Sequence, residues 1–339
     1  MDRLQKYILK NLSSLFLSIF LPLFTIASVI FLIKLATYTA VIQLSIWEMT
    51  KLYIFVLPEI FFYTLPVTFF IASAISLFRL SNDNEIIVLF ALGINPNFIL
   101  KTLLKPAFLL SILMAFDFFI LFPHATVLSS NFISYKRSEA KFNLSASEFG
   151  HKFGDWLLYI GKTNKDSTYG DVLLFNKNKK EEVLISAKEA KVINENGILR
   201  LQLKDGEGYS YSKKSFSQVN FKTMLINDTL TTDLTTYRTP LEYWKSNDRA
   251  KSKRHMMITD VLLSLFPTIS LFLVATIGIV NTRHQKSRIY LYLFLGILVY
   301  FSATLIIQGY IAYYTIPLVA ILWSIGTYIL YKKIILSRF

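Results

Sequence analysis

Six apolar stretches, three before and three after a long polar segment, constrain this chain more than any single motif. They cover residues 12–35, 52–80, 98–123, 258–281, 289–308 and 311–331. Each is about as long as the roughly 20 residues that an α-helix needs to cross about 30 Å of hydrocarbon. The sequence therefore predicts a membrane α-helical protein with six transmembrane helices, arranged 3+3 around an inserted water-facing domain.

The basic residues beside these stretches gather on the side of the two chain ends. Short cytoplasmic segments retain Lys and Arg, whereas short translocated loops do not. Between the first two spans only Lys34 and Lys51 occur, so both termini are expected in the cytoplasm and the polar domain outside. The basic side carries Arg3, Lys6, Lys10, Arg79, Lys101, Lys105, Arg283, Lys286, Arg288, Lys332, Lys333 and Arg338.

The polar segment between residues 149 and 227 has short runs rich in β-branched and aromatic residues, separated by turn formers such as those at 205–208. This spacing, without a long helical pattern, predicts an all-β sandwich or jelly roll. Alternation places Leu199, Leu201 and Leu203 on one face of a strand. The interior is either filled by side chains or open as a slot for acyl chains. Open sheet edges also allow another chain to add a strand.

Several kinds of chemistry have no support in the sequence. Cysteine is absent, so disulfides and thiolate metal ligands are excluded. The four histidines, at 124, 151, 255 and 284, lie in separate segments without metal-ligand spacing. No phosphate-binding loop or nucleophile motif occurs. The sequence therefore predicts no catalytic residue, no metal site and no bound cofactor, so the energy for any active process must come from elsewhere. A nucleic-acid partner is not expected.

The connection between the second and third spans is the most informative short segment. Asn82 is predicted to cap a helix in which Glu85 completes a capping box. Gly93 supplies a stop, so the helix is expected over about 82–93. Its body is apolar on nearly every side, which predicts either docking into a groove on a partner or packing in the membrane interface. The residues assigned to docking are Arg79, Asp83, Glu85, Ile86, Leu89, Phe90 and Gly93.

Charged residues within or beside the spans have two interpretations each. Lys34, at the end of the first span, either reaches the headgroup region along its apolar stem or pairs with the phosphates of a lipid. Glu59 and Asp117 lie within spans, where carboxylates usually face a bundle interior or water. They either form internal hydrogen bonds or belong to a proton pathway.

The order of three spans, a β domain and three further spans resembles the LptF/LptG family of lipopolysaccharide-export permeases, also called YjgP/YjgQ. The resemblance covers essentially the whole chain, and Leu57-Pro58-Glu59 is more similar to the LptF branch than to the LptG branch. The matching motifs are Leu65-Pro66, Arg79-Leu80, Asp83, Glu85 and Ala91-x-Gly93.

The resemblance implies a non-catalytic permease subunit of an ABC transporter in the bacterial inner membrane. Such a subunit pairs with an LptG-like permease on an LptB-like ATPase dimer. Together they extract lipopolysaccharide and pass it through periplasmic β-jellyroll domains towards LptC- and LptA-like proteins. Glu85 falls on the family's coupling glutamate, and Lys34 is the substrate-binding candidate.

Three domains follow from this interpretation. Residues 1–125 are expected to hold spans one to three and the coupling helix. Residues 126–256 are expected to form the periplasmic β-jellyroll-like domain and its return linker, and residues 257–339 spans four to six.

A second class of function remains open, namely a membrane-anchored receptor or scaffold whose β domain binds a partner. Six spans exceed what anchoring needs, which favours transport. A transporter is expected to copurify with an ATPase whose turnover rises with glycolipid, whereas a receptor need not.

Overall fold

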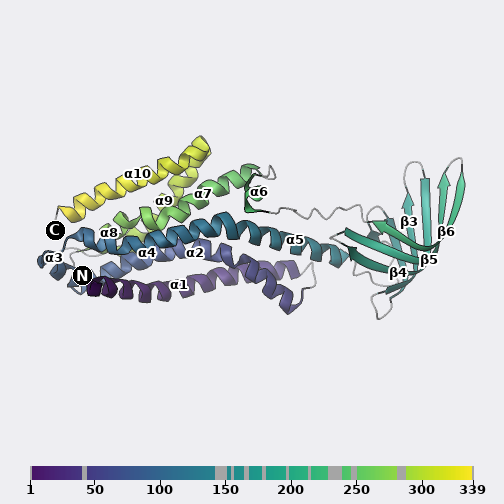
Figure 1. Ribbon diagram of the computed structural model, residues 1–339, viewed down its shortest axis with the longest axis horizontal. Coiled ribbons are helices and arrows are strands. Elements are labelled where there is room, and N and C mark those ends of the chain that lie inside the picture. Colours follow the sequence, from purple (N-terminus) through teal and green to yellow (C-terminus); the bar gives the residue numbers. More distant parts are fainter. Residues whose placement is uncertain are drawn as a thin grey trace. The chain divides into compact units, whose positions relative to one another are not determined.

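The computed structural model describes residues 2–39, 44–141, 151–153, 156–163, 168–177, 181–195, 198–212, 215–227, 239–245, 250–280 and 288–337. The chain divides into two compact units, one mainly helical and one that contains the β-sheet (Figure 1). The helical unit comprises Met1–Lys34, Tyr53–Thr126 and Tyr237–Phe339, and the other comprises Leu35–Leu52 and Val127–Thr236. The domain boundaries expected at 126 and 256 stay predictions, because these units are defined by contacts and not by a membrane.

The helices of the first half form three long arms, and a short helix joins the second arm to the third. They are α1 (Asp2–Thr39), α2 (Ile46–Asn82), α3 (Glu85–Ala91), α4 (Pro96–Phe116), a π-helical turn at Asp117–Leu121 and α5 (Phe122–Lys141). The second half contains α6 (Pro240–Lys245), α7 (Ala250–Ile269), α8 (Leu271–Gly278), α9 (Ile289–Ile311), a 3₁₀ turn at Ala312–Tyr314, α10 (Thr315–Tyr331) and a π-helical turn at Lys332–Leu336.

Four helical stretches are long and apolar enough to cross a membrane, and the bent pair formed by α7 and α8 adds a fifth. The longest stretch, Ile289–Leu336, has 48 residues. A straight helix of that length would measure about 70 Å, more than twice the hydrocarbon core of a bilayer. The chain reverses within it at Ala312, where φ is 47° and ψ is −122°, and α10 packs beside α9 (Figure 1). This stretch is therefore long enough for two crossings, and the predicted membrane α-helical architecture with an inserted β domain is confirmed.

The main apolar core of the helical unit is contributed by both halves of the chain. At its centre the Phe266 ring lies 5.1 Å from that of Phe70 and 4.7 Å from that of Tyr300, measured between centroids. The Tyr300 hydroxyl is buried with them and donates to the Leu262 carbonyl at 2.7 Å. Because helices separated by about 200 residues share this core, the two halves fold as one bundle.

The inserted domain is all-β, as the sequence predicts. Its six strands form one antiparallel sheet in the order β1 to β6, so that neighbours in sequence are neighbours in space. The described strands thus form a single sheet and not the two sheets of a sandwich, which was one of the two β architectures that the sequence allowed. The strands are β1 (His151–Phe153), β2 (Trp156–Thr163), β3 (Thr168–Lys177), β4 (Glu181–Glu195), β5 (Ile198–Ser212) and β6 (Phe216–Asn227).

One face of the sheet carries its apolar cluster. Leu201 and Leu203 of β5 are buried there, as their alternation predicts, together with Leu174 and Ile185 from the neighbouring strands. The turn expected at 205–208 is wrong, since β5 pairs with β4 on both sides of it. Asp205 instead takes a φ of 48° within the strand, which distorts the ladder locally without ending it.

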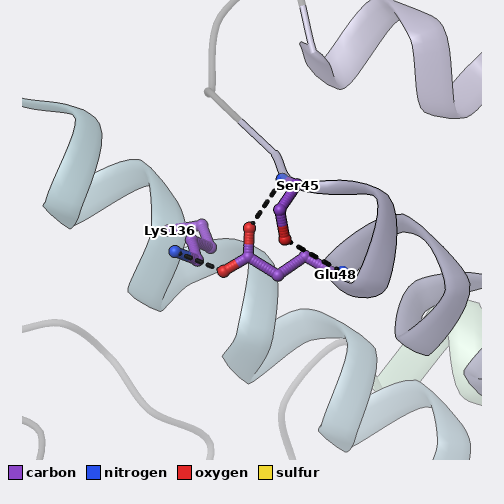
Figure 2. Close-up of polar contacts among 3 residues, drawn as sticks. All are labelled: Ser45, Glu48 and Lys136. Atoms are coloured by element: carbon purple, nitrogen blue, oxygen red, sulfur yellow. Dashed lines mark hydrogen bonds and ion pairs between the residues drawn. The ribbon is translucent and has the colours of Figure 1, made fainter.

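The start of α2 is fixed by a reciprocal hydrogen-bond pair (Figure 2). The Glu48 carboxylate accepts from the Ser45 backbone N–H at 2.8 Å, and the Glu48 N–H donates to the Ser45 hydroxyl at 3.4 Å. This is the Ser-x-x-Glu capping box, which satisfies two backbone donors left free at a helix start. The other Glu48 oxygen pairs with Lys136 of α5 at 2.6 Å. The cap therefore also joins α2 to α5.

Candidate functional site

The short helix α3 lies between two reversals of the chain, and its end follows the sequence closely. Gly93 has a φ of +85° and donates to the Phe90 carbonyl at 2.9 Å, while Ile94 donates to the Leu89 carbonyl at 3.1 Å. This pattern is a Schellman motif, in which a left-handed glycine ends a helix. Asn95 then caps α4 by accepting from the Asn97 N–H at 2.8 Å. The predicted stop at Gly93 is confirmed.

The start of α3 differs from the prediction. Asn82 is the last residue of α2 and not a cap, and Asp83 lies in the turn that follows. The N-cap position belongs to Asn84, which adopts a left-handed conformation with φ 60° and makes no side-chain cap. Asn is one of the few residues with a side chain that visit this region readily. The reversal shortens the helix to seven residues, starting at Glu85.

The apolar residues of α3 divide into an inner and an outer set. Ile86 is 0% exposed, and Phe90 packs against the main core. Val88, by contrast, is 54% exposed, and Leu92 is more exposed still. The residues that attach α3 to the bundle are therefore Ile86 and Phe90, and the outward apolar pair is Val88 and Leu92. That pair was not among the predicted docking residues, although its i, i+4 spacing was visible in the sequence.

Two polar links connect α3 and its flanking turn to distant parts of the bundle. The Tyr7 hydroxyl in α1 donates to the two carboxylate oxygens of Glu85, at 2.9 and 2.7 Å. The Ser81 hydroxyl at the end of α2 donates to the Gly278 carbonyl at 3.1 Å and accepts from the Val280 N–H at 3.4 Å. The segment is thus bonded to α1 and to the end of α8.

The other predicted residues are distributed as follows. Arg79 and Asp83 are exposed beside α3, and Leu89 is half-buried within it. Lys34 is exposed towards the far end of α1 from Tyr7, roughly 40 Å along that helix at 1.5 Å per residue. The structure therefore groups the docking candidates together and places Lys34 well away from them.

The carboxylates expected within the spans differ in their surroundings. Glu59 is exposed, whereas Asp117 and Asp260 are both buried. Asp117 begins the π-helical turn after α4. Asp260 accepts a long hydrogen bond of 3.5 Å from the Tyr63 hydroxyl. Within the described residues, no group of three or more His, Cys, Asp or Glu side chains forms a possible metal site.

Comparison with known proteins identifies the family. The model of the lipopolysaccharide export system permease LptF/LptG matches residues 6–336, nearly the whole chain. The chain belongs to the LptF/LptG family. A search of curated proteins finds no match. Because the family description covers LptF and LptG together, the assignment to the LptF branch stays a prediction.

Membership of the LptF/LptG family fixes the general role of this chain. It is a lipopolysaccharide-export permease of the inner membrane, that is, a transport subunit. As a component of an export system it works with partner proteins. The helical bundle is the membrane part of this LptF/LptG permease, and the six-stranded sheet is its inserted β domain.

Proposed function

We propose that this permease extracts lipopolysaccharide from the inner membrane and passes it to a periplasmic β-jellyroll bridge, driven by a separate cytoplasmic ATPase. The chain would pair with an LptG-like permease on an LptB-like ATPase dimer, which uses the ATP and Mg²⁺. It would hand its substrate to LptC- and LptA-like proteins. No cofactor is assigned to the chain itself.

The observation that carries this proposal is the two-sided character of α3. Ile86 anchors the helix in the core, while Val88 and Leu92 face outward. A solvent-facing apolar pair on a helix that is fixed from behind suits insertion into a groove on another protein. Force applied there reaches α2 and α4 directly, because only short turns separate them from α3.

The same segment offers a route for motion into the other helices. Tyr7 connects Glu85 to α1, and Ser81 connects the end of α2 to α8. Closure of an ATPase dimer against α3 would therefore displace spans from both halves of the chain together. In this mechanism the cavity between two permeases narrows and its lipid moves into the β domain. Lys34 would hold a substrate phosphate before that step, and Lys34→Glu is expected to weaken lipopolysaccharide crosslinking.

Copurification with the ATPase tests the docking role. Val88→Glu places a charge on the outward face of α3 and is expected to abolish ATPase association while membrane insertion persists. Val219→Glu in β6 is the matched control, because Val219 is 56% exposed and Val88 is 54% exposed. Normal ATPase association of the Val88→Glu protein would refute the docking role of this outward face.

The proposed orientation has both termini in the cytoplasm and the β domain in the periplasm. Because the chain has no cysteine, single cysteines can be introduced without background labelling. An impermeant thiol reagent added to intact cells with a permeable outer membrane is expected to label Ser217→Cys in β6 and not Asn97→Cys in α4. Labelling of both positions, or of Asn97→Cys alone, would contradict this orientation.

A further inference from the structure

A cavity in the second half of the helical bundle is separate from the α3 surface and from Lys34. Its volume is about 810 Å³, and it lies among α8, α9 and α10. Residues that form its wall include Ile277, Tyr292, Val299, Trp323 and Gly326. The volume falls within the roughly 300–1,000 Å³ of pockets that enclose small ligands.

Three polar side chains in the wall, Thr276, Trp323 and Thr327, donate hydrogen bonds within the protein. Thr276 donates to the Phe272 carbonyl at 2.7 Å, and Thr327 donates to the Trp323 carbonyl at 2.7 Å. The indole N–H of Trp323 donates to the Ser270 hydroxyl at 3.0 Å. The surface offered to an occupant is therefore mainly apolar, which favours hydrocarbon over a polar ligand.

Two basic residues lie close in sequence to wall residues at one end of this cavity. Arg288, at the N-cap of α9, is exposed, and its carbonyl accepts from the N–H of Tyr292 in the cavity wall at 3.1 Å. Lys333 is also exposed and directly precedes Ile334, another wall residue. This is the end at which Val280 of the wall bonds to Ser81, next to α3. An apolar cavity with cations at one end is complementary to a lipid with an anionic headgroup.

We propose that this cavity binds an anionic phospholipid from the leaflet on the α3 side, with an acyl chain among α8, α9 and α10 and the phosphate near Arg288 and Lys333. Several wall residues on α9 and α10, among them Val299 and Leu330, are exposed. In a bilayer these exposed positions give a lipid chain lateral access. Cavity filling would stabilise the end of α8 that bonds to Ser81.

Gly326 provides a direct test, because a Cβ added there would meet no atom within 4 Å. Gly326→Leu is therefore expected to fill the cavity without displacing neighbouring side chains. The matched control is Gly309→Leu in α9, since a Cβ on Gly309 also meets nothing within 4 Å and Gly309 is not in the wall. Native mass spectrometry of the full chain in detergent measures the binding of dioleoyl phosphatidylglycerol, dioleoyl phosphatidylcholine and inorganic phosphate.

The expected result is retention of phosphatidylglycerol by the unmodified and Gly309→Leu proteins, with at least a tenfold loss of affinity in Gly326→Leu. Arg288→Gln combined with Lys333→Gln is expected to remove most of the preference for phosphatidylglycerol over phosphatidylcholine. A photoreactive acyl chain should label peptides of α8, α9 or α10. Unchanged affinity in Gly326→Leu, equal binding of the two lipids by the unmodified protein, binding of phosphate alone, or labelling confined to other helices would overturn the proposal.

Discussion

The Tyr7 hydroxyl donates to both carboxylate oxygens of Glu85, at 2.9 and 2.7 Å, and so ties the first turns of α1 to the start of α3. These residues are far apart in the sequence, and only the packing of α1 on the bundle brings them together. The same helix, α1, also carries Lys34. It therefore connects Glu85, the coupling candidate, to Lys34, the candidate residue for binding the substrate. Displacement of α3 is therefore expected to act on α1 without passing through the core.

Removing this hydroxyl tests whether the link transmits motion. Tyr7→Phe retains the ring and removes both hydrogen bonds, so the protein is expected to insert, fold and bind the proposed ATPase normally. Stimulation of ATP turnover by lipopolysaccharide in proteoliposomes should fall several-fold, because α1 no longer follows Glu85. Tyr290→Phe, which removes an exposed hydroxyl near the start of α9, is the control. Full stimulation in the Tyr7→Phe protein would show that the contact is only structural.

The inner and outer residues of α3 are expected to differ in how strongly truncation destabilises the protein. Ile86→Ala empties a fully buried position and should lower the free energy of unfolding by about 2 kcal/mol or more. Val88→Ala shortens an exposed side chain and should change the free energy of unfolding by less than about 0.5 kcal/mol. Thermal unfolding in detergent measures both. Equal destabilisation by the two changes would contradict the division of α3 into an anchored and an outward face.

Features set by local chemistry could be predicted from the sequence. The lengths of the apolar stretches located the spans, and Gly93 located the end of α3 because only glycine takes a left-handed conformation without strain. Strand alternation placed Leu201 and Leu203 on the buried face. The start of α6 also follows local chemistry, since Glu242 donates its N–H to the Thr239 hydroxyl at 3.3 Å.

Features set by distant contacts or by competing local signals could not be predicted in this way. Asn82 has the same capping chemistry as Asn84, and the choice between them depends on how far the core extends α2. Nothing local links Tyr7 to Glu85. Asp205 and Gly206 have the composition of a turn, but pairing on both sides of β5 keeps them in the strand. Tertiary pairing overrode the local preference there.

The two glycines of β5 are expected to differ sharply in their tolerance of a side chain. A Cβ on Gly206 would lie 2.3 Å from the Ser186 carbonyl oxygen and 2.4 Å from the Phe221 ring. On Gly208 the nearest atom would be 3.8 Å away. Gly206→Ala should therefore destabilise the sheet by about 1–3 kcal/mol, as overpacking does, whereas Gly208→Ala should be nearly neutral. Hydrogen exchange of β4, β5 and β6 in the full chain measures the difference, and equal protection in both variants would contradict it.

The ion pair between Glu48 and Lys136 should contribute more to stability than a geometrically similar pair in the sheet (Figure 2). Its N···O distance is 2.6 Å, and the side chains of Lys136 and Glu48 are 13% and 24% exposed. Lys177 and Glu182 approach to the same 2.6 Å, but their side chains are 68% and 44% exposed. Exposed pairs are weakened by solvent and by salt, and partly buried pairs less so.

Double-mutant cycles with Glu→Gln and Lys→Met changes at each pair measure this difference. The Glu48 cycle is expected to give a coupling of about 1 kcal/mol that persists in high salt, because the carboxylate is also held by the Ser45 N–H. The Glu182 cycle is expected to give less than about 0.5 kcal/mol, lost in high salt. If the two couplings are equal, burial of the Glu48 pair is not what strengthens it, and the junction between α2 and α5 depends on packing alone.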